Sequence, residues 1–175
     1  HILAFAGGAT PEYDPLYPEI RPPGSILTPF IYLTAFSRGM SPATLTWDIP
    51  IDSSNDLPEV RNPDSQFHGP VRLRTAMAND YLVPASQILA QMGMDQVLKT
   101  AHLMGLTSLD LMRDVKPSEL LLDGSGVSLI ELSQAFGVLA NQGVMVGLER
   151  SEKNHSERTP FVQPLTVLSV TDYEG

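Results

Sequence analysis

The sequence of 175 residues contains no cysteine, only three lysines and no long apolar run. The lack of cysteine excludes disulfides and thiolate metal sites, and it leaves the redox compartment open. Eleven basic residues against twenty acidic ones give a net charge of −9, and the basic residues are scattered, so nucleic acid is not an expected partner. No apolar run approaches the roughly 18 residues that a membrane-spanning helix requires. The composition, 42% hydrophobic, is that of one globular domain with a sizeable core.

The first residues of the chain resemble the interior of a protein rather than a natural start. The sequence opens on His1, without a signal peptide, so we expect an excised fragment whose missing targeting signals carry little weight. Residues 2–6 form a short apolar run that ends at Gly7 and Gly8. That length and those glycines predict a buried strand over residues 2–6.

A rigid turn presents Ser25 at the start of an apolar segment. Two prolines and a glycine precede this serine, and we expect a buried helix over residues 25–38 that ends at Gly39. A helix N-terminus offers unpaired N–H groups and a partial positive charge, so this position suits acyl chemistry at the Ser25 hydroxyl. Thr28 and Pro29 also fit a helix start, with Thr28 as the N-cap and Pro29 at the first helical position.

Ser25, Pro29 and Phe30 resemble the start of the active-site helix of penicillin-binding proteins, where a Ser-x-x-Lys-Pro-Phe segment presents the acylated serine. The resemblance implies that Ser25 occupies the nucleophile's position. It also places Thr28 where the family has the lysine that accepts the serine proton. A threonine hydroxyl is no base near neutral pH, and positioned acid–base catalysis contributes about 10²- to 10⁴-fold in rate. We therefore expect Ser25 to be a poor nucleophile.

The second catalytic motif of that family, Ser-x-Asn before an apolar residue, Pro and Ala, corresponds to the stretch from Asp80 to Ala85. Asp80 stands at the serine position and Leu82 at the asparagine position. A leucine cannot donate the amide hydrogen bond that would orient a substrate, and each unpaired polar group costs about 1 to 3 kcal/mol. The Asp80 carboxylate is open to two interpretations: a substitute base for Ser25, or a solvated residue closing a helix.

Residues 70–143 predict a succession of short helices. The first spans Val71 to Asp80, and Pro84 suits the first turn of the next. Ser128 and Glu131 match a capping box. This box opens the clearest helix of the chain, whose apolar residues recur at spacings of three and four: Leu129, Leu132, Phe136 and Leu139.

Residues 51–70 are polar, rich in proline, aspartate, serine and asparagine, and without periodicity, so they predict a surface loop. His68 in this loop has no second histidine or carboxylate at metal-ligand spacing and is interpreted as solvated. Trp47, just before the loop, is expected to pack rather than bind a ligand. We expect no metal site and no cofactor.

The landmarks run in the family's order along residues 1–175 and predict a single partial transpeptidase-like domain. The expected fold is mostly α with a few β-strands, namely the helical part of the α+β transpeptidase fold, with a strand and turn at residues 160–175. The third family motif, Lys-Thr-Gly, is absent from this sequence, and the lysines stand elsewhere: Lys99, Lys116 and Lys153. The domain is thus degenerate and truncated relative to the family.

The resemblance is nearest to the transpeptidase domain of the bifunctional peptidoglycan synthases of bacteria. It implies acyl-serine D,D-transpeptidase chemistry in cell-wall synthesis, with peptidoglycan stem peptides or β-lactams as ligands if the domain is active. It also implies an extracytoplasmic location, on the periplasm or cell-wall side, through a membrane anchor outside this sequence. The three altered motifs favour a catalytically impaired pseudoenzyme. The alternative is a non-catalytic module that binds a protein partner or cell-wall glycan.

Overall fold

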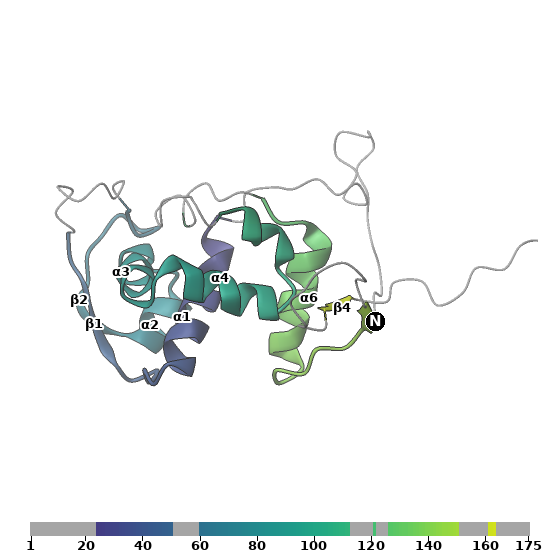
Figure 1. The fold of residues 1–175 in the computed structure, drawn as a ribbon. Coiled ribbons are helices and arrows are strands. Elements are labelled where there is room, and N and C mark those ends of the chain that lie inside the picture. The colour runs from purple at the N-terminus through teal and green to yellow at the C-terminus, as the bar shows by residue number, and fades with distance from the viewer. Residues whose placement is uncertain (1–23, 51–59, 113–120, 122–125, 151–160, 164–175) are drawn as a thin grey trace, which may run out of the picture.

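A computed structural model describes residues 24–50, 60–112, 121, 126–150 and 161–163 (Figure 1). The described residues are mostly helical with a few short strands, which confirms the predicted fold class. The strand expected over residues 2–6 lies outside them, as does most of the segment 160–175.

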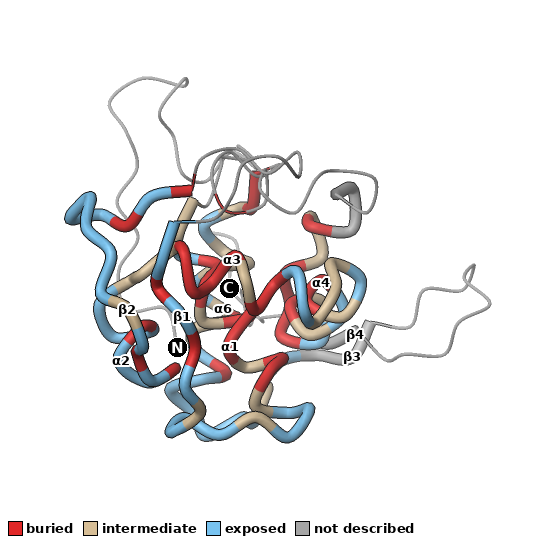
Figure 2. Tube along the Cα trace, turned by 90° about the vertical axis from the view of Figure 1, so that its left-hand side faces the viewer, coloured by how far each residue is buried: buried red, intermediate tan, exposed pale blue. Residues whose placement is uncertain are grey.

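The central element is a buried helix that follows Ser25. A 3₁₀ helix η2 (Gly24–Leu27) leads directly into α1 (Thr28–Ser37). Helix α1 is apolar on nearly every side, a pattern that favours burial on all faces. It lies between the helices on either side of it in Figure 1 and is largely buried in Figure 2. Arg38 caps its C-terminus, and Gly39, with φ of 97°, follows, as the sequence predicts.

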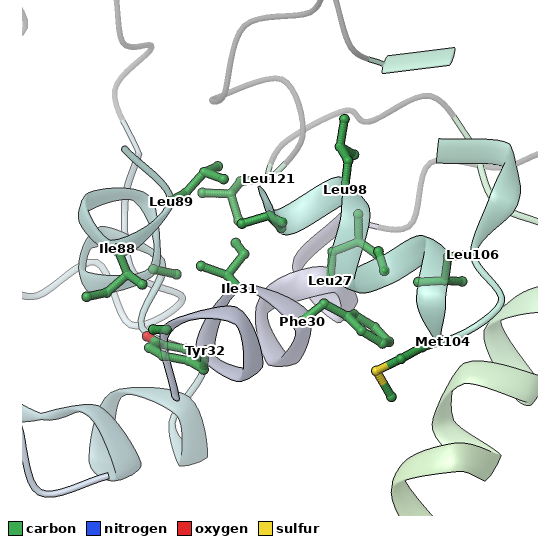
Figure 3. Packing of buried hydrophobic residues seen from close by; sticks show 14 of the residues in the cluster. Leu27, Phe30, Ile31, Tyr32, Ile88, Leu89, Leu98, Met104, Leu106 and Leu121 are labelled. Carbon is green, nitrogen blue, oxygen red and sulfur yellow. The ribbon is translucent and has the colours of Figure 1, made fainter. Parts of the chain in front are cut away.

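Two further helices, α3 (Leu82–Met92) and α4 (Met94–Leu103), pack against α1. Gly93 separates them, and its φ of 83° allows the chain to turn sharply where a side chain would be strained. Figure 3 shows Ile88 and Leu89 of α3 on the same side of α1 as Ile31. Each such buried side chain stabilises the fold by about 1.5 to 3 kcal/mol relative to an exposed one. This core fixes where α3 begins.

The helix predicted from Val71 begins two residues later than expected. Strand β1 (Leu45–Asp48) pairs antiparallel with β2 (Gly69–Arg72), and α2 spans Leu73–Ala78. Val71 lies opposite Thr46 in this ladder. Val71 and Arg72 are therefore in a strand rather than a helix, because pairing with β1 satisfies backbone groups that would otherwise be unpaired.

Strand β1 buries alternate residues, as a strand with one covered face should. Thr46 and Asp48 are buried, whereas Leu45 and Trp47 are 65% and 59% exposed. The expectation that Trp47 packs is therefore wrong, because the strand's period of two turns it away from the core.

The last long helix, α6 (Leu129–Ala140), begins at the predicted capping box. The Ser128 side chain accepts from the Glu131 N–H, and the Glu131 side chain accepts from the Ser128 N–H. Phe136 makes an edge-to-face contact with Phe30 of α1, with ring centroids 5.7 Å apart. The predicted apolar face is only partly buried, because Leu129 and Leu139 are exposed and the buried side chains are Ala135 and Val138. Two short strands, β3 (Leu148–Arg150) and β4 (Phe161–Gln163), pair antiparallel.

Glu131 also joins α6 to the 3₁₀ helix η4 (Thr107–Met112). The hydroxyls of Thr107 and Ser108 donate to its carboxylate at 2.6 and 2.7 Å, and the Ser108 N–H donates at 3.0 Å. Burial alone raises the pKa of the Glu131 carboxyl, but these hydrogen bonds and those from Ser128 outweigh burial and lower the pKa below its ordinary value.

A lowered pKa in the folded state makes Glu131 a source of stability at neutral pH that is lost as the pH falls through the folded-state pKa. We expect Glu131→Gln to lower the free energy of unfolding at pH 7 by about 1.5 to 3 kcal/mol, the range for hydrogen bonds to a charged group. The difference from the parent chain should shrink in acid. Urea unfolding at several pH values measures this, with Asp95→Asn, an exposed carboxylate at the start of α4, as control. A Glu131→Gln difference that stays constant with pH would contradict the assignment.

Candidate functional site

The candidate site lies where α1 begins and the α2–α3 junction packs against it. Ser25 is half-buried on η2, three residues before Thr28, so the two residues lie on neighbouring turns. Gly24 supports the turn with φ of 57°. Within the described part of the chain, the Ser25 hydroxyl makes no hydrogen bond.

Thr28 and Asp80, two predicted site residues that are 52 residues apart in sequence, touch each other. The Thr28 hydroxyl donates to Asp80 Oδ1 at 3.3 Å, and Thr28 is 3% exposed. The interpretation of Thr28 as an N-cap is wrong, because α1 already begins at Thr28, with Leu27 at the N-cap position and no side-chain cap. The threonine hydroxyl turns to the Asp80 carboxylate instead.

The backbone places Asp80 at this contact. Helix α2 ends at Ala78, and Asp80 takes a left-handed conformation with φ of 53°. Aspartate tolerates that conformation better than most residues with a side chain. The Tyr81 N–H then returns to the Ala76 carbonyl at 2.9 Å. The resulting turn connects α2 to α3 and leaves the Asp80 side chain facing Thr28 at the start of α1.

Leu82 is the first residue of α3 and is half-buried. The structure places it two residues after Asp80, at the end of the same turn. Its predicted effect on substrate binding stays a prediction.

A buried polar network lies behind the turn and centres on Asp48. This side chain is fully buried, and Asn62 Nδ2 donates to both of its carboxylate oxygens at 2.8 Å. His68 donates its backbone N–H to Asp48 Oδ2 at 3.0 Å, and its Nδ1 lies 2.7 Å from the same oxygen. His68 is exposed, as expected, but the expectation that it lacks a carboxylate neighbour is wrong, because Asp48 Oδ2 and Asp64 Oδ2 lie 2.7 and 3.1 Å from its ring nitrogens.

The network reaches the candidate site through Tyr81 and α3. The His68 ring stacks on the Tyr81 ring, with centroids 4.1 Å apart and planes 11° apart. Asn62 Oδ1 accepts from the Val83 N–H at 3.1 Å and so pairs a backbone donor in the first turn of α3. Tyr81 lies between Asp80 and Leu82, and Val83 follows Leu82, so the network holds the turn that carries both site residues.

Tyr32, one helical turn after Thr28, is a further polar residue that sequence reasoning missed. It is 1% exposed, and its hydroxyl has no hydrogen-bond partner among the described residues. Burial raises the pKa of the Tyr32 phenol well above its ordinary range, and the Asp80 and Asp48 carboxylates raise it further. An unpaired buried hydroxyl costs about 1 to 3 kcal/mol, so this position is unusual.

Tyr32 belongs to no motif in the sequence, whereas Asn62 begins an asparagine-containing, glycine-closed run that resembles one of the family. Asp48 had a sequence signal, because the alternation of apolar and polar residues over Leu45–Asp48 fits a strand that turns Asp48 to the same side as Thr46.

Across the residues that the structure describes, no three histidine, cysteine or acidic side chains gather as a metal site. No helix in the described ranges is long and apolar enough to cross a membrane.

A family model described as the penicillin-binding protein transpeptidase domain matches residues 4–171. Penicillin-binding protein 1C of Escherichia coli is 34% identical over 127 residues, which cover 71% of this chain and 16% of the relative. Penicillin-binding protein 1A of Vibrio cholerae is 32% identical over 153 residues, covering 83% of this chain and 18% of the relative. The chain thus spans less than a fifth of the length of these two relatives.

Solved structures give the same fold. Penicillin-binding protein 1A from Haemophilus influenzae superposes with a TM-score of 0.63 at 21% identity, covering 75% of this chain and 20% of that one. The PonA1 protein from Mycobacterium tuberculosis, solved in complex with penicillin V, gives a TM-score of 0.61 at 16% identity, covering 70% of this chain and 35% of that one. At these identities the likeness concerns the fold.

Proposed function

Since this chain belongs to the penicillin-binding protein transpeptidase family, we propose that it serves bacterial peptidoglycan synthesis as a transpeptidase-like domain whose Ser25 is acylated poorly or not at all. Its ligands are then the peptides and β-lactams of the family. The longer protein holds the domain on the extracytoplasmic side of the membrane through an anchor outside this sequence.

One observation carries the proposed impairment, namely the contact between Thr28 and Asp80. Two of the three positions where the sequence departs from the family's first and second motifs, Thr28 and Asp80, are hydrogen-bonded to each other. At the positions where the family has a lysine and a serine, this chain has a hydroxyl and a carboxylate in contact. The Thr28 hydroxyl donates its proton to the hydrogen bond with the Asp80 carboxylate. Neither side chain has an amine that could accept the Ser25 proton.

Asp80 is a weak replacement for that amine. A carboxylate is a much weaker base than an amine, so it accepts the proton of a hydroxyl less readily. Its side-chain hydrogen bond is with Thr28 rather than with Ser25. Half-buried Leu82 adds an apolar side chain where the family has an amide donor. These three residues favour slow acylation over an enzyme with a relocated base.

The test is incubation of the full chain with a fluorescent penicillin, followed by intact-mass measurement. We expect no stable adduct above the level of the Ser25→Ala variant, because the proton on Ser25 has no acceptor of suitable basicity. Circular dichroism of both chains shows that they are folded. A stoichiometric adduct that disappears in Ser25→Ala would overturn the proposed impairment.

A second candidate function is a non-catalytic module that binds a protein partner or cell-wall glycan. The exposed face of β1 favours it, because Leu45 and Trp47 are turned outward and Phe67 and Ile49 are 48% and 44% exposed. A contiguous exposed apolar patch marks an interaction surface, and Leu45 and Trp47 share one face of β1. A folded chain in which Ser25 stays unlabelled would leave this role standing beside the first.

A further inference from the structure

The ribbon of β1 and β2 has one face in the core and one face turned away from it. Residues directly opposite each other in an antiparallel pair point to the same side of the sheet. Thr46 and Val71 are such a pair, and both are buried. The pairs on either side of them therefore point outward, and their members are exposed. We call these residues the outer face: Leu45, Trp47, Pro70 and Arg72.

The outer face lies at one end of the molecule. Figure 1 shows α2 and α3 on the inner side of β1 and β2, and Figure 2 views this end directly, with exposed stretches along both strands. Among the described residues, β1 and β2 form a sheet of two strands, and the helices that contact them are α2 and α3. No element of the described ranges therefore covers the outer face.

Apolar surface continues at the end of the ribbon where Asp48 pairs with Gly69. Ile49 directly follows β1, and Phe67 lies two residues before β2. Their side chains are 44% and 48% exposed. Scattered exposed apolar residues are ordinary, whereas a contiguous apolar patch marks an interaction site. Tryptophan is also the residue type most enriched among those that dominate binding energy at interfaces.

The charge on the outer face is positive, although the whole chain has a net charge of −9. Arg72 lies opposite Leu45 in the ladder. Arg74 is also exposed, and its backbone N–H donates to the Pro42 carbonyl at 3.0 Å, which places it near the same end of the ribbon. Within the described ranges, no carboxylate forms an ion pair with either arginine. The outer face thus combines an apolar surface with guanidinium groups that lack a counter-charge there.

We propose that the outer face docks a peptide segment of another protein that carries both large apolar side chains and carboxylates. The apolar side chains pack against Trp47 and Leu45. The carboxylates pair with the guanidinium groups of Arg72 and Arg74, whose planar forks accept a carboxylate in a bidentate geometry. Charge complementarity sets the preference for an acidic segment, and the apolar contacts supply most of the affinity.

A second copy of this chain fits the outer face less well. A twofold interface uses the same patch on both copies, so it would gather two sets of Arg72 and Arg74 without carboxylates between them. Two chains of net charge −9 also repel each other at a distance.

A glycan fits less well for a different reason. Its hydroxyl groups need both hydrogen-bond donors and acceptors, and the side chains of the outer face include no acceptor. Three of the four are apolar or nearly so, which suits apolar side chains of a peptide better than a sugar.

This inference rests on the second candidate function, which it deepens by naming the kind of partner, and it needs no reaction at Ser25. The Ser25→Ala variant should therefore bind the same peptides as the parent chain. The penicillin experiment and the binding experiment can thus fail independently.

The test is a selection from a displayed library of random peptides with the full chain as bait, counter-selected against Trp47→Ser. We expect enriched peptides that contain aspartate or glutamate beside large apolar residues. In fluorescence anisotropy with a labelled enriched peptide, Trp47→Ser should raise the Kd by about 10-fold or more. Arg72→Glu should also raise it and reduce its dependence on salt. Replacing the acidic residues of the peptide by lysine should restore binding to Arg72→Glu. Both side chains are exposed, so the variants should fold as the parent does, which circular dichroism checks.

Leu103→Ser and Lys99→Glu are the matched controls, because both residues are exposed on α4, away from the ribbon, and both variants should bind as the parent does. Failure to recover any peptide whose binding depends on Trp47 would overturn the proposal. So would enriched peptides without acidic residues, or equal losses in the controls. Soluble peptidoglycan strands that bind through Trp47, where no peptide does, would overturn the peptide partner and leave a glycan-binding module standing. Concentration-dependent dimers abolished by Trp47→Ser would assign the face to a second copy instead.

Discussion

Thr28→Lys is expected to raise the rate at which a fluorescent penicillin acylates Ser25 by about 10²-fold, the lower end of the range for positioned acid–base catalysis. The substitution puts an amine three residues after Ser25, on the neighbouring turn. It also puts that amine beside Asp80, since the present Thr28 hydroxyl lies 3.3 Å from the carboxylate. A carboxylate at that distance favours the protonated amine, which is a poor base, so the single substitution cannot give the full effect.

The double variant Thr28→Lys/Asp80→Ser should acylate faster than Thr28→Lys alone, up to about 10⁴-fold above the parent chain. Serine removes the carboxylate that holds the amine protonated and offers a hydroxyl in its place. Comparing both single variants with the double variant isolates the coupling between the two positions. The measurement is the rate of adduct formation by intact mass, at equal protein and penicillin concentrations.

Thr28→Met is the matched control, because it has an unbranched side chain of similar volume to lysine but no amine. It should leave the rate at the parent level. If the double variant acylates no faster than Thr28→Met, the missing base is not what limits Ser25, and Leu82 or the absent Lys-Thr-Gly motif becomes the main obstacle. A Thr28→Met rate equal to that of Thr28→Lys would mean that side-chain bulk, rather than the amine, changes the site.

Local patterns predicted the helical elements of this chain well. The apolar run after Ser25 gave α1, and Ser128 with Glu131 gave the start of α6, because a buried helix and a capping box are both determined by residues close in sequence. The two strands β1 and β2 were harder, since a pair of four-residue strands is stabilised by pairing across a gap of about twenty residues. The start of α2 was misplaced for that reason.

The site was predicted as positions rather than as contacts. Thr28, Asp80 and Leu82 were found from the order of motifs along the chain, but the hydrogen bond from Thr28 to Asp80 spans 52 residues and has no local signature. The same holds for His68, whose partners Asp48 and Tyr81 are brought to it by β1 and by the turn before α3. His68 was therefore expected to lack a partner, although its ring stacks on Tyr81 and lies against the Asp48 carboxylate.

Asp48 carries the largest expected effect on stability in the described part of the chain. Its fully buried carboxylate accepts hydrogen bonds from Asn62 Nδ2 and the His68 backbone N–H, and His68 Nδ1 lies 2.7 Å from Oδ2. Removing one partner from a buried charged network leaves the others desolvated and unpaired, which costs about 3 to 5 kcal/mol. The loss also reaches α3, because Asn62 must stay in place to accept the Val83 N–H.

We therefore expect Asp48→Ala to lower the free energy of unfolding by about 3 to 5 kcal/mol. Asp64→Ala should lower it by no more than about 1 kcal/mol, because exposed ion pairs contribute little. Asp64 is the matched control, since its carboxylate lies 3.1 Å from His68 Nε2 but is 42% exposed. Urea unfolding followed by the fluorescence of Trp47, the only tryptophan in the sequence, gives both values. Equal losses in the two variants would mean that burial does not set the strength of this network, and the turn that presents Asp80 would need another support.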